Sequence, residues 1–321
     1  MLSRKSTCLY VCYNIFMEIP ITQSQDWHKL QGDLGEESIL VEEKDYQYLA
    51  IIKSTPTGKY LYCPYGPVAQ DKEAFKAALT SLKELAAQKS AIFIRVEPFN
   101  EEFQDELPNS AKKSTDLNPK ETWILDLTGN DTEFKSRLPS RLLRYHKSAA
   151  KKGITIERSN NPDDIKHLLK LQRDLADEKG ISTFSENYLK IELEQPFATL
   201  YLAKYEDSII AAGLVFDDKT TRYNLQGAQS DTGRKLHATG ILTIQLILDA
   251  REKHLKTFDF WGIAPEDAPD DHPWKGFTAF KKTFAGTELK HAGTYDIVLN
   301  PFKYHLYQIF RKTNRFIRKN K

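Results

Sequence analysis

Lys281 is the residue with the clearest potential for chemistry. It follows Phe280 in a predicted helix over residues 274–285, where Phe277, Phe280 and Phe284 recur at i, i+3 and i+7 as a stripe that should face the core. A lysine at the margin of such a stripe can extend its ammonium towards a cleft. There it could stabilise a developing negative charge. The alternative is a solvated surface lysine, which is the common fate of charged helix positions.

Two segments concentrate positive charge. Basic residues recur at helical spacing over 137–152 and would line one side of a helix: Arg137, Arg141, Arg144, Lys147, Lys151 and Lys152. Such a side is either a solvated face or a seat for nucleic-acid phosphates. From Pro301 to Lys321 there are seven Lys or Arg and no Asp or Glu, with Phe302, Leu306, Ile309, Phe310 and Ile317 interleaved. This pattern is typical of contact with an anionic membrane or with nucleic acid, and it favours neither.

The composition excludes several classes of protein. The 321 residues, 40% hydrophobic and 28% charged, predict about two soluble globular domains, and no apolar run is long enough to span a bilayer. Three cysteines give no disulfide framework and fit a reducing compartment. The sequence has no Walker-type phosphate loop, no G-x-G-x-x-G, no H-E-x-x-H and no paired C-x-x-C. We therefore expect neither a metal nor a cofactor.

The elements that must position these residues alternate between strands and helices. In the first half we expect strands over 46–52, 59–62, 91–96 and 123–127, and a helix over 71–88 that Asp71 caps. In the second half we expect a helix over 131–152 that Pro139 breaks, a helix over 162–179, a hairpin over 199–216, strands over 154–157, 221–228, 257–262 and 294–299, and a helix over 235–253. These elements predict an α+β fold of two units.

The first sixteen residues do not match this pattern. They contain a short, aromatic-rich apolar stretch after Arg4 and Lys5, interrupted by Asn14 and without a small-residue cleavage site. We interpret residues 1–16 as a disordered or artefactual extension. A weak membrane-surface segment and an export signal are the alternatives.

Several segments, in consistent order over residues 20–310, carry a family resemblance. They are Ile21–Trp27, Tyr65–Val68, Trp123–Leu127, Arg141 to Gly153, Phe258–Phe284 and Gly293–Pro301. Together they resemble the FemABX family of peptidoglycan interpeptide-bridge aminoacyltransferases. The single helix expected over 235–253 resembles the compact members that lack a coiled-coil arm.

The resemblance implies two GNAT-like domains that face a shared cleft. The first would cover 17–130 and be completed by the helix over 301–321, and the second would cover 131–300. The implied reaction moves an amino acid from aminoacyl-tRNA to the stem peptide of a precursor, either lipid II or UDP-MurNAc-pentapeptide, with aminoacyl-tRNA as co-substrate. The implied protein is a cytoplasmic monomer that could contact the inner face of the membrane through 301–321.

The resemblance also assigns roles to residues. Lys281, with Phe280 beside it, matches the family's catalytic Phe-Lys pair. Tyr188 and Lys29 match precursor-binding positions, and Gln226 stands where the family often has a tyrosine. The basic side that includes Arg141, Arg144, Lys147 and Lys151 would seat tRNA. Phe184 and Thr294 depart from the family's arginine and glutamate.

Aminolysis of an ester also requires that the attacking amine lose a proton. Glu97, at the end of the predicted strand over 91–96, could accept it. A solvated strand-end carboxylate is the alternative. Two other functions stay open. One is an acyltransferase that uses acyl-CoA, which is disfavoured because the segment 234–240, where a pyrophosphate loop would lie, contains a single glycine, Gly240. The other is a non-catalytic protein that binds tRNA or membranes.

Overall fold

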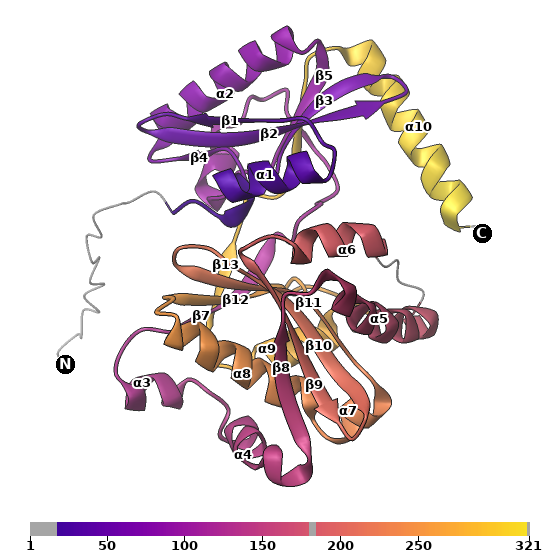
Figure 1. Cartoon of the computed structure of the whole chain (residues 1–321). Coiled ribbons are helices and arrows are strands. Elements are labelled where there is room, and N and C mark those ends of the chain that lie inside the picture. The colour runs from indigo at the N-terminus through magenta and orange to yellow at the C-terminus, as the bar shows by residue number, and fades with distance from the viewer. Residues whose placement is uncertain (1–17, 180–183, 320–321) are drawn as a thin grey trace, which may run out of the picture.

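Two sheets organise the chain, and helices flank each of them (Figure 1). The computed structural model describes residues 18–179 and 184–319. Within these residues, seven strands form the first sheet in the order β1-β2-β3-β5-β14-β6, with β4 paired to β2. Seven others form the second sheet in the order β13-β7-β12-β11-β10-β9-β8. The predicted α+β class is confirmed. The expectation for residues 1–16 falls outside the described residues.

The first sheet is antiparallel except for the parallel pair β3 and β5. Its strands are β1 Ser38–Glu42, β2 Tyr46–Thr55, β3 Gly58–Cys63, β4 Val68–Ala69, β5 Ala91–Val96, β6 Lys112–Lys113 and β14 Tyr295–Val298. Its helices are η1 Ile21–Gln23, α1 Gln25–Asp33, α2 Lys72–Gln88, η2 Glu101–Glu106 and α10 Pro301–Lys319. The apolar face of α2 packs on this sheet. Phe75 and Leu82 from the helix form a core there with Ile94 from β5.

The second sheet is antiparallel except for the parallel pair β11 and β12. Its strands are β7 Glu121–Asp126, β8 Ile154–Ser159, β9 Ala198–Tyr205, β10 Ser208–Asp217, β11 Thr221–Gln229, β12 Thr257–Gly262 and β13 Thr287–Lys290. Its helices are α3 Asp131–Ser136, α4 Ser140–Ser148, η3 Ala150–Lys152, η4 Pro162–Asp164, α5 Ile165–Lys179, α6 Glu186–Leu193, α7 Asp231–Lys235, α8 Ala238–Glu252 and α9 Lys275–Lys281. Helix α8 is buried along its length and forms the core with β10 and β12.

Two strands cross the predicted domain boundaries at 130 and 300. Strand β7 precedes residue 130 but pairs with β12 and β13 of the second sheet. Strand β14 precedes residue 300 but pairs with β5 and β6 of the first sheet. Both placements follow from backbone pairing over long sequence distances, which local periodicity does not encode. Helix α10 packs on β5, where Tyr304 and Tyr307 contact Phe93.

Local signals predict two element ends correctly. The Asp71 carboxylate accepts a hydrogen bond from the Ala74 N–H at 2.8 Å and caps α2, as predicted. Pro139 separates α3 from α4, also as predicted.

Helix α9 is shorter than predicted, because it ends at Lys281 instead of residue 285. The chain then turns, which buries Phe284 against Phe260 and brings Gly286 onto β7. A Cβ on Gly286 would clash with the backbone of β7 at Ile124, so only glycine fits there. The prediction that Phe277 faces the core is wrong: its side chain is 43% exposed. Once the helix stops, the i, i+7 stripe is no longer one face.

Candidate active site

A cavity of about 950 Å³ opens where two strands of the second sheet separate. Strands β11 and β12 pair only where Thr221–Tyr223 lie beside Thr257–Asp259, although both strands continue further. Each strand has a pairing irregularity at this point, one beside β10 and one beside β7, and bulges bend strands away from their neighbours. The separated strand ends, the start of α8 and helix α9 line the cavity.

Lys281 lies in the wall of this cavity, at the last residue of α9. Its Nζ donates a hydrogen bond to the Gly262 carbonyl at 2.5 Å. Burial lowers the pKa of Lys281 to about 8, and the charge of Asp259 opposes that shift. The side chain is therefore an ammonium at neutral pH. Among the described residues the Gly262 carbonyl is its hydrogen-bond partner, and an ammonium has three N–H donors, so two remain for a ligand.

Asp259 supports this arrangement from within β12. Its buried carboxylate accepts a hydrogen bond from the Trp261 N–H at 2.7 Å, and Trp261 has a positive φ of 65°. This turn at the end of β12 presents the Gly262 carbonyl to Lys281. Burial raises the pKa of Asp259 to about 7, and the nearby Lys281 ammonium opposes the rise.

Aromatic and basic side chains share the rest of the lining. Trp261, Trp274 and Phe277 line the cavity, and Trp274 is 40% exposed. The guanidinium-bearing residues Arg141 and Arg234 line it as well. Aromatic faces stack on nucleobases and guanidinium groups bind phosphates, so this lining suits the end of a nucleic-acid strand.

Close packing between two helices brings Arg141 to the cavity. A Cβ on Gly240 would lie 2.7 Å from Leu142, so the glycine at the start of α8 lets α4 approach. Gly240 is thus used for helix packing. Next to this contact, the rings of Tyr145 and His237 stack at 4.6 Å, and both helices are fixed relative to one another.

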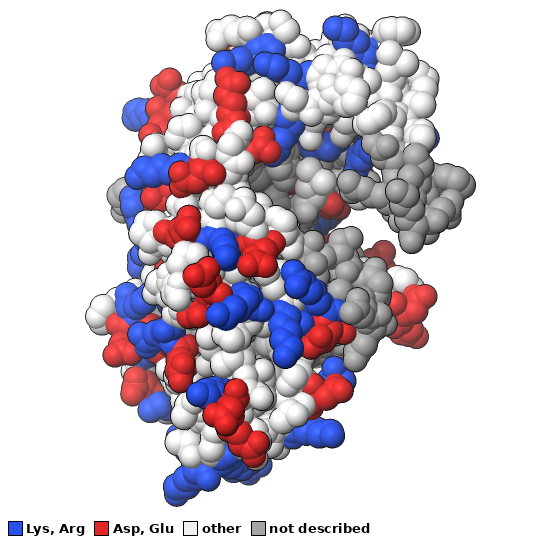
Figure 2. Space-filling view, turned by 45° about the vertical axis from the view of Figure 1, so that its right-hand side comes forward, with Lys and Arg blue, Asp and Glu red and all other residues white. Residues whose placement is uncertain are grey.

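The remaining basic residues predicted for tRNA lie outside the cavity. Arg144 and Lys147 are exposed on α4, and Lys151 is exposed on η3. In Figure 2 the lowest part of the molecule, where Figure 1 places α4, is blue. The positive charge that begins with Arg141 at the cavity therefore extends outwards along α4 and η3. Their role in binding tRNA stays a prediction.

Tyr188 and Gln226 lie together, but not in the cavity. Successive side chains of a strand point to opposite faces, so Gln226 points away from the cavity that its neighbours Leu225 and Gly227 line. The Gln226 amide donates to Glu192 at 3.5 Å, and Tyr188 is hydrogen-bonded to the same carboxyl. Burial raises the pKa of Glu192 to about 8. Sequence reasoning missed this buried acid. It follows Tyr188 by one helical turn on α6.

Lys29 lies on α1 with an exposed side chain, and it is not part of the cavity lining. Helix α1 packs against α6, so Lys29 and Tyr188 belong to neighbouring helices. The predicted precursor-binding residues are thus near one another in the fold and separate from Lys281.

Glu97 is a structural carboxylate. Its side chain is 2% exposed, which excludes the solvated strand end. It accepts hydrogen bonds from Thr294 Oγ1 and Asn118 Nδ2, each at 2.7 Å, and from the Tyr62 hydroxyl at 2.9 Å. Its oxygens are committed to protein donors, and it does not line the cavity. The geometry therefore does not support the expectation that Glu97 accepts a proton from the substrate.

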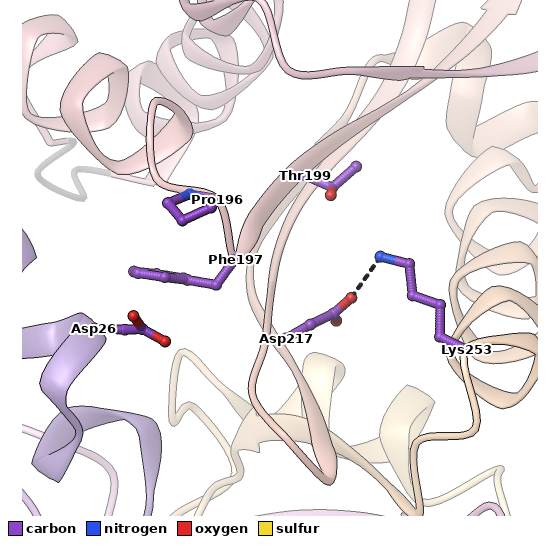
Figure 3. A pocket seen from close by; sticks show the side chains of 6 residues that line it. All are labelled: Asp26, Pro196, Phe197, Thr199, Asp217 and Lys253. Atoms are coloured by element: carbon purple, nitrogen blue, oxygen red, sulfur yellow. Dashed lines mark hydrogen bonds and ion pairs between the residues drawn. The ribbon is translucent and has the colours of Figure 1, made fainter.

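A second hollow, of about 260 Å³, lies between α1 and the start of β9 (Figure 3). Two of its charged residues are paired: Asp217 accepts from Lys253 at 2.8 Å and from Arg222 at 2.6 Å. A paired carboxylate has little left to offer a substrate, so we do not consider this hollow an active site. Elsewhere in the described chain, no group of three or more His, Cys, Asp or Glu is placed to hold a metal ion.

Comparison with known proteins gives the site a context. Residues 186–312, which include α9 and Lys281, match the FemAB family, and the whole described fold matches the crystal structure of FemX with a TM-score of 0.76. The second half of the chain is therefore similar to the FemAB family. The FemX match has 20% sequence identity and covers 89% of this chain and 94% of FemX. No curated protein has a significantly similar sequence.

More distant structures share the fold. L-PGS from Bacillus licheniformis matches with a TM-score of 0.57 and 14% identity over 93% of this chain and 99% of its own. A protein of unknown function from Bacteroides thetaiotaomicron matches with a TM-score of 0.55 and 13% identity over 85% and 88%. The predicted α+β fold, organised around two sheets, is confirmed. Family and fold support a transferase of the acyltransferase class.

Several residues of the site were not predicted from the sequence. Asp259 stands between Phe258 and Phe260, and a charged residue in the middle of a buried strand is a usable signal. Trp274 and Arg234 carried no comparable signal, because loop aromatics and basic residues near helix ends are common on surfaces. Within the described residues, no helix combines the length and apolar character needed to cross a bilayer.

Proposed function

We propose that the protein transfers an amino acid from aminoacyl-tRNA to an amine on the stem peptide of a peptidoglycan precursor. The observation that carries this proposal is the half-buried ammonium of Lys281 in the wall of a cavity that is also lined by aromatic and guanidinium side chains. The match of residues 186–312 to the FemAB family supports the same reaction.

The reaction needs charge stabilisation more than it needs activation. The ester of aminoacyl-tRNA is already activated, so the amine nitrogen attacks its carbonyl carbon directly. A tetrahedral oxyanion forms, the ester C–O bond breaks, an amide C–N bond forms, and the ribose hydroxyl leaves with a proton. A cation aimed at the oxyanion supplies the main catalytic effect. We assign that role to Lys281, whose amine is held by Gly262, and Phe280 packs beside it on the cavity wall.

The donor fits the cavity, and the acceptor must reach it. Trp261, Trp274 and Phe277 would stack on the terminal bases of tRNA, while Arg141 and Arg234 would bind its phosphates. The precursor would bind near Lys29, Tyr188 and Gln226, outside the cavity, and extend its peptide amine to Lys281. The protein would act in the cytoplasm as a monomer, with aminoacyl-tRNA as co-substrate and no separate cofactor.

A transfer assay tests the proposal. Full-length protein is mixed with tRNA that carries a labelled amino acid, and with either lipid II or UDP-MurNAc-pentapeptide as acceptor. Label should move to an acceptor, and the choice of acceptor identifies its form. Acyl transfer from acyl-CoA without transfer from tRNA would replace this function with the acyl-CoA reaction. Binding of tRNA without any transfer would make the protein a non-catalytic binder.

A further inference from the structure

Helix α10 has one face that packs on the first sheet and another face that is exposed. Its inner face is fixed to the first sheet: Tyr304 and Tyr307 pack on Phe93, and the Tyr304 hydroxyl donates to Asp296 at 2.9 Å. Arg311 adds a hydrogen bond to Ser114 at 3.3 Å. These contacts set the rotation of the helix about its axis, so the direction of its outer face is fixed too.

The outer face is apolar and exposed. Phe302 is 73% exposed, Ile309 50%, Phe310 41% and Leu306 40%. With about 100° of rotation per residue, these four positions fall within roughly 100° of the helix circumference. Tyr304 lies opposite this arc, and Tyr307 lies between the arc and Tyr304. In Figure 1 this helix runs along the side of the first domain, far from α4. A contiguous exposed apolar stripe of this kind marks an interaction surface.

Basic residues border the stripe on both sides. By helical geometry Lys303 lies at one margin, next to Phe310, and Lys312 lies at the other. Strand β6 adds the exposed Lys112 and Lys113, and the Lys112 ammonium lies 5.3 Å from the centre of the Tyr304 ring. Among the described residues, none of these four lysines is paired with a carboxylate. In Figure 2 the upper right of the molecule, around α10, is white and blue.

We propose that the outer face of α10 docks the protein on the surface of an anionic lipid bilayer. An apolar stripe with lysines at its margins matches the headgroup boundary, where the stripe enters the acyl region and the ammonium groups meet lipid phosphates. RNA gains nothing from the aliphatic Leu306 and Ile309. A second copy would bring like charges together, because the chain has no Asp or Glu from Pro301 onwards. Docking does not depend on the proposed transfer reaction.

Vesicle co-sedimentation of the full chain tests this proposal. The wild type should bind vesicles of phosphatidylglycerol and phosphatidylcholine in equal amounts, and should not bind phosphatidylcholine alone. Replacing Lys303 and Lys312 by Glu should weaken binding about 25-fold or more, at roughly fivefold for each basic residue near an anionic surface. Replacing Phe302 and Phe310 by Gln should weaken it at least about tenfold for each buried ring that is removed.

Matched variants separate docking from charge and folding effects. Lys44→Glu with Lys83→Glu makes the same change in net charge at exposed positions of the first domain, and it should retain most of the vesicle binding. All three double variants change exposed side chains and should keep the wild-type Tm. Transfer to a water-soluble acceptor should be unchanged in the α10 variants, so a failure of docking is distinct from a failure of the proposed reaction.

Four outcomes would overturn the proposal. They are no binding to anionic vesicles, equal binding to neutral vesicles, a wild-type dimer that Phe302→Gln with Phe310→Gln converts to a monomer, or a loss of tRNA binding in the Lys303→Glu with Lys312→Glu variant. The third would assign the stripe to a second copy of the chain, and the fourth would assign it to RNA.

Discussion

Two buried cations, Arg95 in the first sheet and Lys281 in the cavity of the second, are paired to different degrees. In the first sheet, Arg95 and Asp296 are almost fully buried and form two hydrogen bonds, at 2.7 and 2.8 Å, and Tyr304 adds a third to the same carboxylate. In the cavity of the second sheet, Lys281 has one carbonyl partner. Complete pairing stabilises a fold but leaves nothing for a ligand, whereas an incompletely paired cation is available for chemistry.

The largest effect should come from breaking the complete pair. Asp296→Ala leaves Arg95 buried without its carboxylate, which should lower the free energy of unfolding by about 3–5 kcal/mol, measured by urea denaturation. Glu288→Ala is the control, because Glu288 pairs with Lys282 and Lys290 at the surface, and it should leave stability nearly unchanged. Equal losses of stability in the two variants would show that the buried pair is not special.

The next effect concerns the incomplete pair. Lys281→Met keeps the aliphatic stem and removes the charge, which should cost about 2.7–4 kcal/mol of transition-state stabilisation, or roughly 10²–10³ in turnover. KM should change much less, because the charge matters mainly in the transition state. The matched control is Lys282→Met, whose ammonium lies 3.7 Å from Glu288 and 5.4 Å from the Trp123 ring. If both variants behave alike, Lys281 is only a surface lysine.

The pH dependence of turnover sharpens the same point. Burial lowers the pKa of Lys281 to about 8, so an ammonium-dependent turnover should fall as the pH rises through 8. Asp259→Asn keeps the hydrogen bond to Trp261 but removes the carboxylate that holds the pKa of Lys281 up, and should move this fall about one unit towards lower pH. Identical pH profiles in wild type and variant would show that Asp259 does not influence the pKa of Lys281.

Folding stability provides an internal check on that experiment. Between pH 8 and the ordinary lysine value of 10.5, the unfolded chain keeps the Lys281 proton that the folded chain has released. Through this group stability rises with pH in that window. A fall in turnover near pH 8 with no fall in Tm therefore reports the site and not unfolding.

The smallest effect concerns the outer end of the cavity. Arg141→Glu with Arg144→Glu should weaken tRNA binding and reduce the slope of log Kd against log salt by about one for each phosphate that is no longer neutralised. Arg141 lines the cavity and Arg144 is exposed beside it. Lys44→Glu with Lys83→Glu is the charge-matched control, measured by filter binding over a salt series. An unchanged slope would make the two arginines ordinary surface residues.

Features that depend on neighbours in the sequence were predictable. Asp71 and Pro139 set the ends of helices through interactions within one turn. Lys281 was found because it stands beside Phe280 in a segment that resembles a known family. These signals are local, and local geometry does not depend on the rest of the fold.

Features that depend on distant parts of the chain were not predictable. Nothing around Trp261 indicates its positive φ, which comes from the end of β12 and the Asp259 side chain. Glu97 resembled a solvated strand end until Thr294, almost two hundred residues away, was placed beside it. Phe277 is exposed because it lines the cavity, which forms only where β11 and β12 separate.

The position of β14 has a consequence for the order in which the chain folds. All strands of the second sheet come from the contiguous stretch 121–290, whereas the first sheet needs β14, at residues 295–298, between β5 and β6. During synthesis the first sheet can therefore be completed only after β14 has been made, later than the second sheet, which reverses the usual N-terminal-first order. A ribosome-bound nascent chain in which Ala292 is followed by an unstructured linker long enough to span the exit tunnel should contain a protease-resistant second domain and a protease-sensitive first domain. Pairing of β14 with β5 and β6 would then be the step that completes the first sheet.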